Sequence, residues 1–311
     1  MDHSILIRKL ELYGVDRKTI GWFRSYLSNR KQHTYVNGRL SNCLPLVCGV
    51  PQGSVLGPLL FLVYINDLPN CFLSSTVKMF ADDTSLTACA KDPVELESTL
   101  NDDLKVIYNW LKVNKLTLNV NKTKYIILSN HYRLNNLSHE FELKVEHQTL
   151  KQEQCYRYLG LNIDETLSWG AQVEYIKEKI SAGIAVLKRT RTLVPRKTLL
   201  LMYNALVQPY FDYCNEVWGC LNKCLSEKLQ KLQNRAAKVI TATENDFDTR
   251  SEDVLDELGW VPLDKMRANK LAIAVYKSVN DLHAEGLKAL LKPTFSQYSR
   301  KFSKYLCPQT I

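Results

Sequence analysis

The sequence predicts an α+β fold in which a part of mixed helices and strands is followed by a helical part. Two short runs of strand-forming residues, 76–80 and 84–88, flank Ala81-Asp82-Asp83 in the pattern of a tight hairpin. Helical and strand-like segments follow up to about residue 164. Beyond Trp169, apolar residues recur with the 3.6-residue period of helices. This change of period predicts a boundary between residues 164 and 170.

The composition indicates a globular protein, and its charge favours an acidic partner without deciding it. The chain has 311 residues, of which 45% are hydrophobic and 23% charged, enough for two or three compact units. Lys and Arg outnumber Asp and Glu by 41 to 32, and the net charge of +9 favours nucleic acid over a small neutral metabolite. The longest apolar run, residues 59–65, is far below the roughly 20 residues of a membrane span, so we expect no membrane partner.

The nine cysteines indicate a reducing compartment. Their number is odd and their positions form no paired framework, so we expect an intracellular protein, in the nucleus or the cytoplasm, with buried or incidental thiols. Cys214, Cys220 and Cys224 do not have the spacing of a zinc knuckle, and packed thiols are favoured over a structural zinc.

The elements before the central hairpin follow from local patterns. Residues 4–27 have helical spacing that is interrupted near Gly14, which predicts two short helices. The Asn37-Gly38 pair between strand-forming residues predicts a hairpin. Residues 55–68 are apolar on nearly every side, which predicts a helix buried against other elements and ended by Pro69-Asn70.

The elements after the hairpin begin with a capped helix. Asp92 can cap, Pro93 suits the first turn and Glu95 can reach back, so a helix is expected from there to about Val113. The remaining expectations are strands at 124–128, 141–145 and 156–163, and helices within 173–187, 199–207, 225–240 and 253–291.

The hairpin tip carries the chemistry. Carboxylate oxygens are the ligands that hard cations such as Mg²⁺ prefer, and two such ions about 4 Å apart stabilise the attacking and leaving oxygens of a phosphoryl transfer. An isolated Asp-Asp pair in a turn is more often structural, because Asp is common in turns. Asp82 and Asp83 therefore need a second motif before they indicate a metal site.

That second motif is the segment from Gly49 to Leu60, GVPQGSVLGPLL, which precedes Phe80-Ala81-Asp82-Asp83 by some 30 residues. In sequence and order, the two motifs resemble those of the reverse transcriptases of non-long-terminal-repeat retrotransposons, the LINE or jockey-like class. Residues 114–124, 158–164 and 203–219 are similar to later blocks of the same family. The resemblance covers roughly residues 1–238.

The resemblance implies an RNA-directed DNA polymerase domain that extends a DNA primer on an RNA template, using deoxynucleoside triphosphates and Mg²⁺ or Mn²⁺. Residues 1–168 would be the remainder of a polymerase palm with its primer-grip strands. Residues 169–245 would form a helical thumb-like region, and residues 246–311 a helical extension.

The resemblance also implies roles for individual residues. Asp82 would bind both catalytic metals and Asp83 would lie beside it at the tip. Template and substrate would be bound by two groups of residues. The first is Pro51, Gln52, Gly53 and Lys122. The second is Tyr158, Leu159 and Gly160 at the primer grip.

Basic side chains after Trp169 supply the positive charge that a nucleic-acid channel needs. A solvated helix face is the alternative explanation for them. The residues concerned are Lys177, Lys179, Lys188, Arg189, Arg191, Arg196 and Lys197.

The chain departs from the family pattern at its start. Family members have another metal-binding aspartate on an earlier palm strand, and Met1-Asp2-His3 resembles the end of the segment that follows it. Finger strands are missing too. We therefore expect a truncated, weakly active or inactive polymerase in which Asp2 is no substitute for the missing ligand. The alternatives are a non-catalytic RNA- or DNA-binding remnant and a chain that folds poorly because a sheet edge is uncovered.

Overall fold

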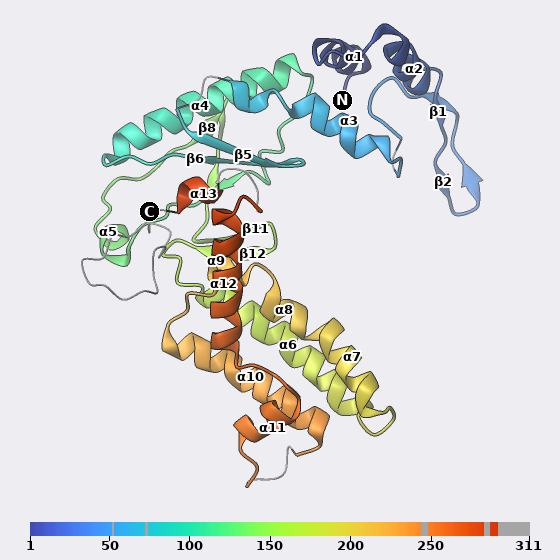
Figure 1. Ribbon diagram of the computed structural model, residues 1–311. Coiled ribbons are helices and arrows are strands. Elements are labelled where there is room, and N and C mark those ends of the chain that lie inside the picture. Colours follow the sequence, from blue (N-terminus) through green and yellow to red (C-terminus); the bar gives the residue numbers. More distant parts are fainter. Residues whose placement is uncertain (52, 72–73, 244–247, 283–286, 292–311) are drawn as a thin grey trace. The chain divides into compact units, whose positions relative to one another are not determined.

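The described residues form two compact units (Figure 1). The computed structural model describes residues 1–51, 53–71, 74–243, 248–282 and 287–291. The first unit comprises Met1–Ile127 and His131–Glu153, and the second comprises Leu128–Asn130 and the described part of Gln154–Ile311. Helices and strands are mixed, in agreement with the predicted α+β class. Among the described helices, none is long and apolar enough to cross a lipid bilayer.

Three helices build the main core of the first unit: α1 (His3–Leu12), α2 (Arg17–Leu27) and α3 (Leu56–Ile65). Asp2 and Asp16 cap the first two by accepting hydrogen bonds from first-turn N–H groups. Gly14, with φ of 83°, allows the chain to reverse between them. The prediction of two short helices interrupted near Gly14 is confirmed. The core residues include Leu6, Leu10, Ile20, Leu60 and Tyr64.

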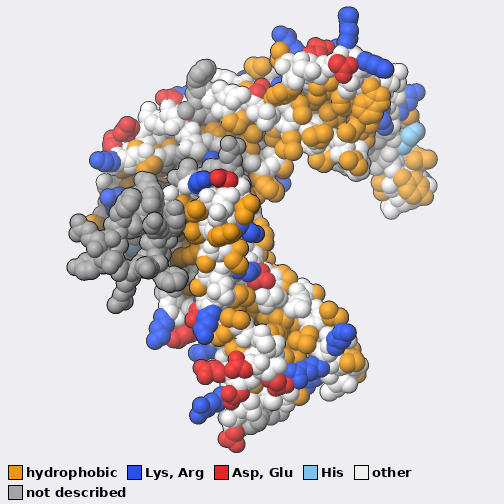
Figure 2. All heavy atoms as spheres, in the orientation of Figure 1, with side chains coloured by type: hydrophobic (Ala, Val, Ile, Leu, Met, Phe, Trp, Pro, Cys, Tyr) orange, Lys and Arg blue, Asp and Glu red, His pale blue; other side chains and the backbone are white. Residues whose placement is uncertain are grey.

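The prediction for residues 55–68 is wrong in two respects. The helix α3 ends at Ile65, and a 3₁₀ turn, η1 (Leu68–Asn70), follows it. One face of α3 is also exposed, with 56% of Leu59 and 48% of Leu62 accessible. Figure 2 shows hydrophobic side chains gathered over α3. A helix that is apolar all round gives no sequence signal for which face is covered.

Short strands follow α2. The pair β1 (Lys31–Gln32) and β4 (Leu44–Pro45) is antiparallel and encloses the hairpin of β2 (Tyr35–Val36) and β3 (Arg39–Leu40). Asn37 and Gly38 form the hairpin turn with φ of 49° and 78°. The predicted hairpin is confirmed, because this pair of residues tolerates left-handed backbone conformations.

The rest of the first unit packs on α4 (Pro93–Val113), whose start is capped by Asp92 as predicted. Leu143, Val145 and Leu150 form a small core against the Leu100 and Leu104 side of α4. The segments around this core are the parallel pair β7 (Lys124–Tyr125) and β10 (Lys151–Gln152) and the hairpin β8 (Lys144–Val145) and β9 (Gln148–Thr149). The short helix α5 (His131–Asn135) has no buried residue. The strands predicted at 124–128 and 141–145 are therefore shorter than expected.

The second unit begins with a hairpin where a single strand was predicted. Residues 156–163 divide into β11 (Cys155–Tyr158) and β12 (Leu161–Asp164), which pair antiparallel. Leu159 and Gly160 turn the chain with φ of 44° and 86°. Strand-forming residues stand on both sides of the turn, so the pattern of the segment resembles one long strand. Gly160 was the signal for the reversal.

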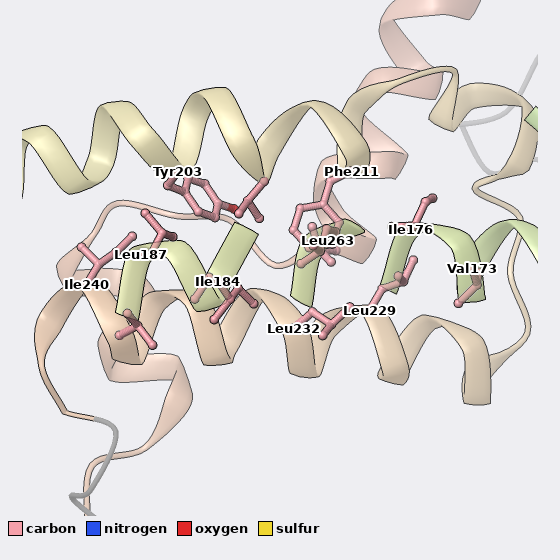
Figure 3. Packing of buried hydrophobic residues seen from close by; sticks show 14 of the residues in the cluster. Val173, Ile176, Ile184, Leu187, Tyr203, Phe211, Leu229, Leu232, Ile240 and Leu263 are labelled. Atoms are coloured by element: carbon pink, nitrogen blue, oxygen red, sulfur yellow. The ribbon is translucent and has the colours of Figure 1, made fainter. Parts of the chain in front are cut away.

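Helices make up the rest of the second unit, and the helical pattern predicted beyond Trp169 is confirmed. They are α6 (Gly170–Thr190), α7 (Arg196–Leu206), α8 (Gln208–Asp212), α9 (Asn215–Trp218), α10 (Lys223–Thr241), α11 (Ser251–Glu257), α12 (Leu263–Val279) and α13 (Leu287–Leu290). Figure 3 shows α6 contributing Ile176, Ile184 and Leu187 to a core that α10 closes with Leu229 and Leu232. Each such fully buried side chain stabilises the fold by about 1.5–3 kcal/mol relative to exposure.

One carboxylate fixes the joint between β12 and α6. Asp164 accepts hydrogen bonds from the N–H groups of Ser168 and Trp169, both at 2.8 Å, and from the hydroxyl of Thr166 at 2.8 Å. The hairpin also packs on α6, since Leu161 lies in the core and the Asn162 N–H donates to Gln172 Oε1 at 2.9 Å. The hairpin thus belongs to the helical unit, whereas the change of sequence period grouped it with residues 1–168.

Candidate active site

The two aspartates lie at the end of the hairpin formed by β5 (Thr76–Phe80) and β6 (Asp83–Thr87). The expected three-residue tip is corrected: Asp83 is the first residue of β6 and pairs with Phe80, so Ala81 and Asp82 alone make the turn. Both aspartates are exposed. The arrangement places two carboxylates on consecutive residues at one end of a short ladder.

The turn carries backbone strain. Ala81 has φ of 51°, in the left-handed region that costs a residue with a Cβ about 1–2 kcal/mol. Strained backbone of this kind persists where the surrounding structure determines it, and it is frequent at functional sites. Two-residue hairpin turns commonly need a positive φ at this position, so the unusual feature is that alanine, and not glycine or asparagine, occupies it.

A buried aspartate holds the start of the hairpin. Asp103 of α4 is 3% exposed and accepts hydrogen bonds from the Ser75 N–H and hydroxyl at 2.7 and 2.6 Å. The Ser74 N–H donates to its other oxygen at 3.1 Å. At the other end of β5, Met79 packs against the main core of the first unit. The hairpin is thus fixed both to α4 and to the core that contains α3.

Asp103 was not identified from the sequence, although a signal exists. It lies four residues before the buried Ile107 and three after Leu100, on the apolar side of α4. A charged residue at such a position must be hydrogen-bonded, because burying it otherwise costs several kcal/mol. That requirement points to a partner segment, which is the start of β5.

The turn before α3 is the second predicted part of the site. Gly49 and Gly53 have φ of 81° and 80°, and Gly53 is exposed, with no atom within 4 Å of the position a Cβ would take. Ser54 closes the turn by donating from its hydroxyl to the Pro51 carbonyl at 2.8 Å. The space beside Gly53 admits a close approach by another backbone. Gln52 lies outside the described residues.

Loop and hairpin attach to one core. Val50 and Leu56, which flank the turn, pack on the same cluster as Met79 of β5. The two motifs that carry the family resemblance therefore share a support within the first unit. The position of the turn relative to the hairpin is therefore set by this one core.

Lys122 also lies in the first unit. Its side chain is exposed, and its N–H donates to the Asn119 carbonyl at 3.0 Å in the turn before β7. A shallow cavity of about 500 Å³ beside it is lined by Thr117, Leu118, Asn119, Val120, Asn121 and Gln148. The side-chain amides of Asn119, Asn121 and Gln148 can both donate and accept hydrogen bonds.

Tyr158 is the last residue of β11, and Leu159 and Gly160 form the turn of the β11–β12 hairpin, in the second unit. The Tyr213 hydroxyl donates to the Leu159 carbonyl at 2.7 Å. A Cβ on Gly160 would lie 3.3 Å from the Tyr213 ring, so a larger residue would displace that ring. The structure groups these three residues with the helical unit and not with the unit that holds Asp82.

The basic cluster is partly neutralised. Lys177 pairs with Glu174 at 2.7 Å, and Arg196 pairs with Glu257 at 2.6 Å. Lys179 lies over the Tyr175 ring at 5.6 Å. These pairs agree with the solvated-face explanation for part of the cluster, and they reduce the charge available to a nucleic acid.

Metal-ligating side chains do not gather into a larger cluster in the described part of the chain. No group of three or more His, Cys, Asp or Glu residues that could hold an ion occurs among the described residues. Of the two alternatives expected for the cysteines, buried or incidental, burial does not hold for Cys43, Cys48, Cys89, Cys155, Cys220 and Cys224, which are exposed free thiols. Cys214, Cys220 and Cys224 form no metal-binding group with other described residues.

Comparisons with known proteins agree with these motifs. The family model described as "Reverse transcriptase (RNA-dependent DNA polymerase)" matches residues 1–163. The chain is 26% identical over 231 residues to the "Probable RNA-directed DNA polymerase from transposon X-element" of Drosophila melanogaster, an alignment that covers 72% of this chain and 25% of that protein. It is likewise 26% identical over 230 residues to the "RNA-directed DNA polymerase from mobile element jockey" of the same species, covering 70% and 24%.

A third relative is the "Retrovirus-related Pol polyprotein from type-1 retrotransposable element R1 2" of Nasonia vitripennis. It is 27% identical over 244 residues, which cover 75% of this chain and 59% of that protein. The chain thus spans about a quarter of the length of the first two relatives and rather more than half of the third. The resemblance to LINE-like elements drawn from Gly49–Leu60 and residues 80–83 is confirmed.

Proposed function

The chain belongs to the reverse transcriptase (RNA-dependent DNA polymerase) family, and on this premise we propose that it extends a DNA primer on an RNA template by nucleotidyl transfer. The observation that carries the proposal is the exposed pair of carboxylates at the strained turn of β5–β6, a hairpin whose opposite end is fixed by buried Asp103. RNA template, DNA primer and deoxynucleoside triphosphates are the proposed partners. The proposed setting is intracellular.

Asp82 and Asp83 fit a divalent cation, Mg²⁺ or Mn²⁺. Both supply carboxylate oxygens, which hard cations prefer. Within the described part of the chain, no basic side chain forms an ion pair with either of them. A bound divalent cation supplies charge stabilisation to the attacking and leaving oxygens of phosphoryl transfer. The protein's own contribution is to hold the two carboxylates at a fixed, exposed position.

Two carboxylates on one hairpin occupy only some coordination positions of a two-metal site. Mg²⁺ takes six ligands, and water and substrate phosphates fill those that protein does not. We therefore expect weak metal affinity and slow extension by this chain. Asp2 does not supply another ligand, because it caps α1 and pairs with Lys115 at 2.7 Å.

The other predicted residues take supporting roles in this proposal. Template and nucleotide lie against the turn that contains Pro51 and Gly53, Gln52 contributes to their binding, and Lys122 binds phosphate. The first unit supplies the palm elements. The helical unit supplies a thumb with basic side chains, and Tyr158, Leu159 and Gly160 contact the primer.

A primer-extension assay tests the proposal. The chain is incubated with poly(rA), oligo(dT), dTTP and Mg²⁺ or Mn²⁺, beside Asp82→Asn and the control Asp102→Asn, which alters an exposed aspartate of α4. We expect slow extension that Asp82→Asn lowers about 10²–10³-fold, as for loss of a charge that stabilises a transition state. Asp102→Asn should leave the rate unchanged.

Two further measurements separate the outcomes. Binding of Mn²⁺ alone, followed by the electron paramagnetic resonance of the free ion, should weaken in Asp82→Asn and not in Asp102→Asn. RNA binding is titrated against salt, because phosphate contacts give a steep salt dependence. Salt-sensitive binding by a folded chain that neither extends primers nor binds Mn²⁺ through Asp82 would identify a non-catalytic nucleic-acid-binding protein instead.

A further inference from the structure

We infer that His3 is a positioning residue that holds the Gly49–Ser54 turn in the conformation in which Gly53 is presented. The role in holding the turn stands on hydrogen bonds alone. Its consequence for template and nucleotide rests on the proposed function. The residues concerned are Asp2 and His3 at the start of α1, with Tyr64 and Lys115 behind them.

Three successive contacts join the start of α1 to the turn. Asp2 forms an isolated antiparallel bridge with Cys48. The Gly49 N–H donates to the Met1 carbonyl at 2.7 Å, and His3 Nε2 donates to the Gly49 carbonyl at 2.7 Å. Both polar groups of the Gly49 backbone are thus bound to residues more than 40 positions earlier in the chain.

The Asp2 end of these contacts is itself fixed. Its carboxylate accepts from the N–H groups of Ser4 and Ile5 and from Lys115 Nζ at 2.7 Å. The Lys115 ammonium and the Ile5 N–H keep the pKa of Asp2 below its ordinary value. The Asp2 carboxylate is therefore a charged helix cap that is held by three hydrogen bonds.

Tyr64 connects the same cap to the core. The Asp2 N–H donates to the Tyr64 hydroxyl at 3.2 Å, and that hydroxyl donates to the Asn114 carbonyl at 2.6 Å. Tyr64 is fully buried in α3. The start of α1 is consequently bound to α3 and to the end of α4, so it provides a rigid support for Gly49.

The bond from His3 has a fixed direction. A carbonyl oxygen only accepts, so His3 Nε2 must carry the proton. The neutral tautomer with hydrogen on Nε2 and the charged ring both satisfy this requirement, and the contact therefore does not depend on protonation of His3. A glutamine places an amide N–H the same number of bonds from Cβ and can replace the donor.

The bond matters because Gly49 has no side chain to restrict it. With φ of 81°, Gly49 is in a region that only glycine adopts freely, and many other conformations are equally open to it. Its carbonyl leads directly into Val50 and the Pro51–Ser54 turn. Fixing that carbonyl fixes the direction in which the turn leaves the core.

Hydrogen–deuterium exchange of the full chain tests the role in holding the turn. We compare His3→Leu, His3→Gln and the control His131→Leu, which changes an exposed histidine of α5. In His3→Leu, amides of residues 48–54 should exchange about fivefold faster, the factor for one lost hydrogen bond. Alkylation of the exposed Cys48 thiol by iodoacetamide, followed by peptide mass spectrometry, should accelerate likewise.

His3→Gln should restore both rates, and His131→Leu should change neither. Peptides from the second unit serve as an internal reference for global unfolding. Unchanged exchange in His3→Leu, or faster exchange that His3→Gln does not restore, would overturn the inference.

Primer extension gives the functional consequence. Misplacement of a substrate-binding turn should raise KM for dTTP or primer–template about 10–100-fold in His3→Leu, with recovery in His3→Gln. Failure of the unaltered chain to extend primers would refute the proposed function, and the exchange comparison would still decide the inference about His3.

Discussion

The Lys9 ammonium lies 2.6 Å from the Asp67 carboxylate in a pocket where the lysine side chain is only 11% exposed. The same ammonium donates to the Tyr64 carbonyl at 2.6 Å and lies 4.8 Å from the centre of the Trp110 ring. The Lys9 ammonium therefore gives a hydrogen-bond partner to a carbonyl in the last turn of α3. It also connects α1, α3 and α4.

Replacing Lys9 by Met should destabilise the first unit by about 1–3 kcal/mol, because the Tyr64 carbonyl loses its partner, whereas the more exposed Asp67 stays hydrated. Urea unfolding followed by the fluorescence of Trp22 and Trp110 measures this loss. Lys105→Met is the control, since its pair with Asp102 is exposed and worth less than about 1 kcal/mol. Equal effects of the two substitutions would contradict the assignment of Lys9 as a structural cation.

The second unit should lose stability in acid through Asp164. Burial alone would raise the pKa of this carboxyl, but hydrogen bonds from Ser168, Thr166 and Trp169 lower it below the ordinary 3.8. Its stabilising contribution is therefore complete above pH 3.8 and is lost as pH falls through the lower folded pKa.

Asp164→Asn removes that dependence. Thermal unfolding between pH 7 and pH 2.5, followed by tryptophan fluorescence of the second unit, should show a lower midpoint at pH 7 and a smaller fall towards acid than the unaltered chain. An identical acid profile in the variant would show that other groups govern the transition.

The approach of α6 to the end of α7 depends on Gly183. A Cβ there would lie 3.0 Å from the Leu206 carbonyl oxygen and from Val207 Cγ2. Overpacking of this kind costs about 1–3 kcal/mol, which exceeds the roughly 1 kcal/mol by which Ala favours a helix. Gly183→Ala should therefore destabilise the second unit.

Gly21→Ala is the matched substitution, because Gly21 is in helix α2 and no atom lies within 4 Å of its added Cβ. It should stabilise the first unit by about 0.5–1 kcal/mol. Chemical denaturation with unit-specific tryptophans measures both changes, and stabilisation by Gly183→Ala would disprove the close contact.

Gly53→Ala should reduce primer extension at least tenfold without unfolding the chain. An alanine at φ of 80° is strained by about 1–2 kcal/mol, and its methyl group enters the open space beside the turn. Gly38→Ala is the control, since Gly38 has φ of 78° and open surroundings in the β2–β3 turn. Equal losses of extension in both variants would mean that backbone strain, and not the space at Gly53, is responsible.

Local signals predicted the elements that depend on local chemistry. Asp92 capped α4, and Asn37-Gly38 turned a hairpin, because capping and left-handed turns are properties of a few adjacent residues. The exposed face of α3 and the shortened strands depend on distant partners, which periodicity does not encode. Asp103 belongs with these, since its partners Ser74 and Ser75 lie 28 and more positions away.

The candidate site was predicted in part. Motif order identified the hairpin of Asp82 and the turn of Gly53, and the structure places both on one core. The roles of the individual residues stay predictions. Sequence alone did not indicate that Asp2 and His3 support the turn. The contacts are a backbone bridge from Asp2 to Cys48, the bond from the Gly49 N–H to the Met1 carbonyl and the bond from His3 Nε2 to the Gly49 carbonyl, and none of them leaves a local sequence pattern.

The β11–β12 hairpin is anchored at both ends, by Asp164 at the joint with α6 and by Tyr213 at the Leu159 carbonyl. Arg157 adds a lateral contact over the Tyr175 ring. A slip of one residue along the ladder would turn Leu161 out of the core, so the register is locked. A displacement of Tyr158–Gly160 relative to α6 would break these contacts, so the hairpin and the helices it touches form one rigid piece of the second unit.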